Sequence, residues 1–150
     1  MLPESGPYLT IATFCEKAIQ SREGMLSLIN VADRFTISAV GPDAPSEMPI
    51  QALPWSLVLT FKSGEAHGTY QIKITPELPS GIKLPSFTLP AHFEGRNRGV
   101  QLILNLQMQI REPGLYWFWV HFEDQFVTKV PVEVIYSRYS ISPAGSPPAN

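Results

Sequence analysis

The sequence predicts an all-β protein built as a two-sheet antiparallel β-sandwich of about eight or nine strands. Apolar and polar residues alternate along short segments, turn residues separate these segments, and no segment has the period of an amphipathic helix. The chain of 150 residues contains 15 prolines and 10 glycines, which suits short strands joined by turns. Residues 1–139 are expected to form a single domain, with a closed barrel as the alternative, and residues 140–150 (SISPAGSPPAN) a disordered tail.

The first half of the chain alternates less cleanly than the second. A first strand is expected at 7–15, followed by a polar segment at 16–23 that has room for one helical turn. The long β-rich run at 25–40 breaks its alternation at 30–33, which predicts a bulge or bend there. Residues 41–54 are expected to form a loop.

Further along the chain, two apolar strands at 55–62 and 69–75 are expected to pair as a hairpin around the turn at 63–68. The Pro-rich segment 76–85 has the length of a crossover between sheets. Residues 87–93 contain Pro90, which cannot donate a ladder hydrogen bond, so they are expected at a sheet edge. Residues 100–110 show the most regular alternation and predict one long strand.

The stretch Glu112–Tyr136 (EPGLYWFWVHFEDQFVTKVPVEVIY) predicts two long antiparallel strands joined by a tight turn at 123–125. Side chains alternate between faces along a strand. One face of the first strand carries Tyr116, Phe118, Val120 and Phe122. This face is expected to enter the core together with Val130, Val132 and Val134 of the return strand. The opposite face carries Leu115, Trp117, Trp119, His121 and Glu123. Pro131 marks the return strand as an edge or bulged strand.

The start of this hairpin resembles the last two strands of immunoglobulin-like domains. Glu112, Gly114 and Tyr116 stand in the acidic, Gly and Tyr places of that family's acidic-x-Gly-x-Tyr-x-Cys run, and Phe118 replaces the Cys. The resemblance implies that the Tyr116 hydroxyl bonds back to nearby backbone and that the usual inter-sheet disulfide is missing.

A broader resemblance covers roughly residues 8–136. The segments YLTIATFCEK, GMLSLINVADRFTI and GLYWFWVHFEDQFVTKVPVEVIY are similar to a family of small bacterial proteins that carry only a domain-of-unknown-function label. This resemblance implies a cytoplasmic bacterial β-protein, and it brings no activity, cofactor or catalytic residue.

The composition excludes several classes of function. The formal net charge of −2 and the scattered basic residues argue against nucleic acid as a partner. Cys15 is the sole cysteine, so neither an internal disulfide nor a Cys-based zinc site can form, and a reducing cytoplasmic location is expected. The first residues do not show a basic segment followed by an apolar core, so a signal peptide is not expected, and without an apolar run of membrane-spanning length no membrane association is expected.

Candidate chemical sites are weak. His92-x-Glu94 and His121-x-Glu123 could supply metal ligands, but these are more simply outward polar positions, and no metal or other cofactor is expected. Cys15 is more typical of a small buried residue than of a nucleophile. Asp33 and Arg34 are interpreted as a buried ion pair that fixes a bend, with a pocket role for Asp33 as the lesser alternative.

The aromatic stripe on the opposite face of the hairpin is the favoured binding site. Trp117, Trp119 and His121 cannot share the core face, and large exposed aromatic patches usually mark contacts. The alternative is that loops or the N-terminal segment cover them. We therefore expect a non-enzymatic interaction module that binds a protein partner or self-associates through this face. A small-ligand or carbohydrate-binding domain is the second hypothesis, and a metal-dependent enzyme using His92, Glu94, His121 and Glu123 the third.

Overall fold

A computed structural model of the chain describes residues 5–139, so the expected tail at 140–150 lies outside the described residues. The described part consists of strands, turns and loops without a helix, and no segment of it forms a helix that could cross a bilayer. The strands are β1 (Tyr8–Gln20), β2 (Leu26–Ala32), β3 (Arg34–Val40), β4 (Gln51–Ala52), β5 (Ser56–Lys62), β6 (His67–Glu77), β7 (Phe87–Glu94), β8 (Gly99–Leu104), β9 (Gln109–Ile110), β10 (Gly114–Phe122) and β11 (Gln125–Tyr139).

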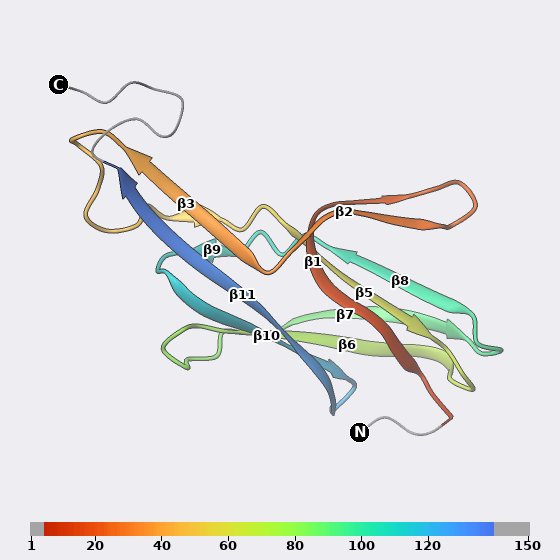
Figure 1. Cartoon of the computed structure of the whole chain (residues 1–150). Helices are drawn as coiled ribbons and strands as arrows, with labels where there is room; N and C mark the ends of the chain where they lie inside the picture. The colour runs from red at the N-terminus through yellow and green to blue at the C-terminus, as the bar shows by residue number, and fades with distance from the viewer. Residues whose placement is uncertain (1–4, 140–150) are drawn as a thin grey trace.

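These strands form a β-sandwich, which confirms the predicted fold class (Figure 1). A four-stranded sheet has the order β2-β1-β5-β8, and a five-stranded sheet has the order β3-β11-β10-β6-β7. The short strands β4 and β9 pair separately. The strand pairs are antiparallel except that β3 runs parallel to β11.

The core lies between the two sheets and is built from the inward side chains of both. Phe14 of β1 meets Phe118 of β10 with ring centroids 4.9 Å apart, and Phe61 of β5 meets Phe93 of β7 at 5.8 Å. These four rings are at most 1% exposed. Apolar burial of this kind is the main stabilising contribution to a sandwich of short strands.

Several sequence-based expectations about strand pairing are wrong. β5 and β6 do not form a hairpin, because β5 pairs with β1 and β8 in one sheet whereas β6 pairs with β10 and β7 in the other. The crossover between sheets therefore occurs at the turn 63–66. The Pro-rich segment after β6 connects β6 to its own neighbour β7 and stays within one sheet. β7 lies at the edge of that sheet, as Pro90 predicts.

Other strands end elsewhere than expected. The polar segment after Cys15 is strand to Gln20 rather than a helical turn, because it pairs with β2. The run at 25–40 breaks at Asp33, within the expected 30–33, but the two parts, β2 and β3, belong to different sheets. The single strand expected at 100–110 is divided into β8, which ends at Leu104, and the short β9. Gln107 lies between them and has a φ of 51°, which is not a strand conformation.

The return strand of the closing hairpin, β11, has a register shift opposite Val120 and His121, which fits the expected bulge, but it is not an edge strand over its whole length. It lies between β10 and β3, but its pairing with β3 begins only at Glu133. Pro131 precedes that point and faces β10 alone, so its missing N–H costs no ladder bond to β3.

The end of the β1–β2 hairpin curls over the four-stranded sheet to which it belongs, which the sequence did not predict. β1 bends, and the hairpin folds back over the side of the four-stranded sheet that faces away from the core (Figure 1). The side chain of Gln20 reaches Gln101 of β8 at 2.6 Å, and Gln101 in turn donates to the carbonyl of Gly24 at 3.0 Å. Cys15 and Val58 are fully buried although neither belongs to the central core cluster, so the outer side of this sheet is partly covered as well.

Candidate functional site

The outer side of the five-stranded sheet carries a cluster of aromatic rings that we call the aromatic face: Trp117, Trp119 and His121 of β10 and Phe126 of β11. Alternation along β10 buries Tyr116, Phe118, Val120 and Phe122 and leaves the aromatic-face residues of this strand partly exposed. Phe126 lies opposite His121 in the ladder, and its ring centroid is 5.5 Å from Trp119 and 5.9 Å from His121. The expected division of the hairpin into an inner and an outer face is therefore observed.

Two lysines lie over the indole rings. The Lys129 ammonium is 4.2 Å from the ring centroid of Trp117 and 4.9 Å from that of Trp119, and the Lys83 ammonium is 4.3 Å from Trp119. Lys129 comes from β11 directly opposite Trp119, whereas Lys83 reaches the face from the loop between β6 and β7. Such cation–π contacts each contribute about 0.5–1 kcal/mol at partly exposed sites. The lysines therefore partly cover the indoles.

Two ring nitrogens on the aromatic face have no hydrogen-bond partner. Nε1 of Trp119 and Nδ1 of His121 are both buried and unpaired. Burial lowers the pKa of His121 below its usual value, and the positive charges of Lys73 and Lys83 lower it further against the opposing effect of Asp124. Burial and the two lysines therefore both favour the neutral form of the His121 ring.

Lys73 completes the positive charge of this surface. It stands on β6 directly opposite His121, so both side chains share the outer side of the sheet. Sequence reasoning missed the gathering of Lys73, Lys83 and Lys129 around the rings. Alternation alone places Lys73 and Lys129 outward, but their proximity depends on the strand order β11-β10-β6, which joins segments distant in sequence.

The tyrosine corner implied by the resemblance is present next to this face. The Tyr116 hydroxyl donates to the carbonyl of Glu112 at 2.6 Å, and Tyr116 is 1% exposed. Burial raises the pKa of the Tyr116 phenol. This bond fixes the chain where it enters β10, so it sets the position from which Trp117 and Trp119 project.

The other candidates from the sequence do not assemble into sites. His92 on β7 and His121 on β10 are separated by β6, and no cluster of three possible metal ligands occurs within residues 5–139. Asp33 and Arg34 are exposed rather than buried, and Arg34 lies 4.0 Å from Glu133 instead. Cys15 is fully buried, and burial raises the pKa of its thiol.

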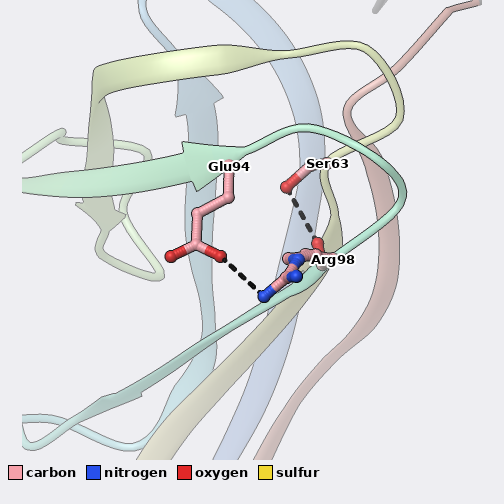
Figure 2. Close-up of polar contacts among 3 residues, drawn as sticks. All are labelled: Ser63, Glu94 and Arg98. Atoms are coloured by element: carbon pink, nitrogen blue, oxygen red, sulfur yellow. Dashed lines mark hydrogen bonds and ion pairs between the residues drawn. The ribbon is translucent and has the colours of Figure 1, made fainter.

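Turns at one end of the sandwich are fastened to each other by polar contacts. The Ser63 hydroxyl donates to the carbonyl of Arg98 at 2.8 Å, and the Arg98 guanidinium lies 3.3 Å from Glu94 (Figure 2). Ser63 is fully buried at the crossover between the sheets, so the bond to Arg98 replaces the hydrogen bond that its hydroxyl would otherwise make to water. These contacts are structural and lie on a different part of the molecule from the aromatic face.

Comparison with solved structures finds distant likenesses. An immunoglobulin-like protein from Pseudomonas aeruginosa aligns with 10% sequence identity and a TM-score of 0.43, over 88% of this chain and 99% of that one. A β-glucosidase from Listeria innocua in complex with glucose aligns with 14% identity and a TM-score of 0.42, over 83% of this chain and 16% of the glucosidase. Comparison with curated proteins gives no significant match.

The sequence pattern of one protein family matches most of the chain. The match covers residues 10–135, which include both sheets and the whole of the aromatic strand β10. The chain belongs to this family, which is described as a family of unknown function (DUF6941).

Proposed function

We propose that the protein is a non-enzymatic binding module that uses the aromatic face to hold a protein partner or a second copy of the chain. The observation that carries this proposal is the ladder of partly exposed rings at Trp117, Trp119 and His121 on the outer side of a sheet whose inner side already supplies the core. Trp is enriched at the energetic centres of protein interfaces. Leu115 and Phe126, 43% and 44% exposed, extend the apolar surface at either end.

The lysine contacts favour a protein partner over a neutral sugar. A sugar ring binds by stacking flat on an indole, and ammonium groups already lie over both indoles at 4.2–4.3 Å. A sugar would have to displace them and would lose cation–π contacts that a carbonyl- or carboxylate-bearing protein surface can retain. Titration with neutral monosaccharides is therefore expected to leave the tryptophan fluorescence unchanged.

Site-specific photo-crosslinking tests the proposal. A benzophenone amino acid replaces Phe126 in one sample and Ile29 in a matched control, because Ile29 is similarly exposed at 40% but lies on the β1–β2 hairpin that covers the other sheet. Crosslinking is carried out in extract of the organism that encodes the protein and with the purified protein alone. A product, either a heteromeric complex or a covalent dimer, is expected from position 126 and not from position 29.

A Trp117→Ser, Trp119→Ser double variant carrying the benzophenone at 126 completes the design. Its far-ultraviolet circular dichroism and melting curve show whether the sandwich is intact. A folded double variant is expected to lose the crosslinked product. Equal products from positions 126 and 29, or a product that survives in the folded double variant, would contradict the proposal.

A further inference from the structure

The charge on the aromatic face differs in sign from the charge of the whole chain. The chain has a formal net charge of −2, yet three of its five lysines, Lys73, Lys83 and Lys129, gather around the rings of one sheet face. Charges placed within a few ångströms of one apolar surface act together on a bound group. This face is therefore a positive patch on an acidic protein.

The lysines of the positive patch form no ion pair within residues 5–139, although Asp124 opposes the effect of Lys73 and Lys83 on His121. The two ion pairs within residues 5–139 join Arg34 to Glu133 and Arg98 to Glu94, so neither involves these three lysines. Glu77 stands opposite Trp117 on β6 but does not reach ion-pair distance of a lysine. Glu133, which stands opposite Leu115 on β11, is already engaged by Arg34.

We propose, resting on the function proposed above, that the aromatic face docks a protein segment in which Asp or Glu residues flank apolar side chains. The carboxylates would meet the ammonium groups of Lys83 and Lys129, which already lie beside the rings. The apolar side chains would pack on Trp117 and on the exposed edge of Phe126. Charge complementarity of this kind selects partners and speeds association.

An acidic protein segment fits this surface better than nucleic acid does. Affinity for nucleic acid comes largely from many phosphate contacts, and the three lysines offer few. The remaining charge of the protein is negative and would repel a long polyanion. A short acidic segment needs only local complementarity with the patch.

Short synthetic peptides of equal length test the proposal by isothermal titration calorimetry, which reports binding in variants without the two indoles as well. The first peptide alternates Glu with Leu, the second replaces each Glu by Gln, and the third replaces each Glu by Lys. The acidic peptide is expected to bind roughly tenfold more tightly than the amide peptide, because exposed ion pairs contribute modestly and about three can form. This preference should shrink as salt is added. The basic peptide should bind least.

Lysine variants show whether the proposed groups are responsible. A Lys83→Gln, Lys129→Gln variant is expected to bind the acidic peptide several-fold more weakly and the amide peptide as the wild type does. Lys17→Gln is the matched control, because Lys17 is an exposed strand lysine on the β1–β2 hairpin. It should change neither affinity.

The outcomes separate the two proposals. Equal affinity for the acidic and amide peptides, with both lost in Trp117→Ser, Trp119→Ser, would overturn the acidic partner and leave the binding face standing. Acidic-peptide binding that survives in the folded tryptophan double variant would overturn both. Tighter binding of an oligothymidylate or of polygalacturonate than of the acidic peptide would overturn the acidic protein segment as the occupant.

Discussion

Replacing two neighbouring residues of β10 tests the division into inner and outer faces on which the candidate site depends. Phe118 is fully buried and packs 4.9 Å from Phe14 across the sandwich. Phe118→Ala removes a large core ring, which costs about 3–5 kcal/mol of unfolding free energy. For a chain of this size, about 2–4 °C of melting temperature is lost per kcal/mol, so a fall of roughly 6–20 °C is expected.

Trp117 lies on the outer face and is only partly buried. Trp117→Ala removes one cation–π contact with Lys129 and a modest apolar area, together about 1–2 kcal/mol. Calorimetry of both variants, with urea unfolding as a second probe, should give clearly separated values. A loss for Trp117→Ala as large as that for Phe118→Ala, in a sample whose stability does not depend on protein concentration, would refute the outward placement of the indole.

Concentration dependence is the control for this comparison. If two copies of the chain associate through the aromatic face, the wild-type melting temperature rises with protein concentration and Trp117→Ala removes that rise. Phe118→Ala lowers the melting temperature at every concentration, because the core of each copy is affected.

Three further variants address single contacts. Tyr116→Phe removes the hydroxyl bond to the Glu112 carbonyl and should lower the unfolding free energy by about 1 kcal/mol in urea titrations, whereas an unchanged midpoint would argue against the tyrosine corner. Trp119→Phe removes a buried N–H without a partner, so calorimetry should show neutral or slightly raised stability, and a large loss would mean that this N–H is paired. The pKa of His121 in the folded chain lies below its ordinary value of about 6.5. Between these two values the unfolded chain therefore binds more protons than the folded chain does. The free energy of unfolding is consequently higher above this pH range and falls as the pH is lowered through it. His121→Gln should flatten this part of the stability profile measured by urea unfolding, and an unaltered slope would assign it to another group.

The features predictable from the sequence are those that a single strand determines. The alternation along β10 has large rings on both faces, but the inner set is matched by Val130, Val132 and Val134 on the neighbouring strand, which identifies the core side. Pro90 likewise indicates an edge strand because it has no N–H to donate. The Glu112–Tyr116 run specifies the tyrosine corner through residues only four positions apart.

Strand pairing is harder to predict, because it depends on contacts between segments that are distant in the sequence. All of Leu57–Phe61 is buried, since the β1–β2 hairpin covers the outer side of β5, so this strand has no polar face to indicate its place in a sheet. The turn at 63–66 then permits either a hairpin or a crossover, and the sequence does not distinguish them. The expected strand at 100–110 is interrupted near Gln107, which has a positive φ. Glutamine rarely adopts a positive φ, so its presence in the sequence does not predict the interruption.

The lysines of the candidate site were missed for the same reason. Lys129 alternates with Val130 and Lys73 with Ile72 and Ile74, so each is predictably outward. Their gathering requires β6 to pair with β10, although β5 was the expected partner of β6. Lys83 comes from an irregular loop in which no period predicts its direction.

The two outer sides of the sandwich differ in how the chain covers them. The β1–β2 hairpin covers part of the outer side of the four-stranded sheet, where Cys15 and Val58 are fully buried and Ile11 and Ile103 stay exposed. Within the described residues, no paired hairpin lies over the indoles of the five-stranded sheet, which are contacted by the side chains of Lys83, Lys129 and Phe126. Flexible lysine side chains can move aside at the cost of weak cation–π contacts, whereas a paired hairpin can be removed only by breaking its hydrogen bonds and packing. This difference favours the aromatic face over the other outer side as the proposed docking surface.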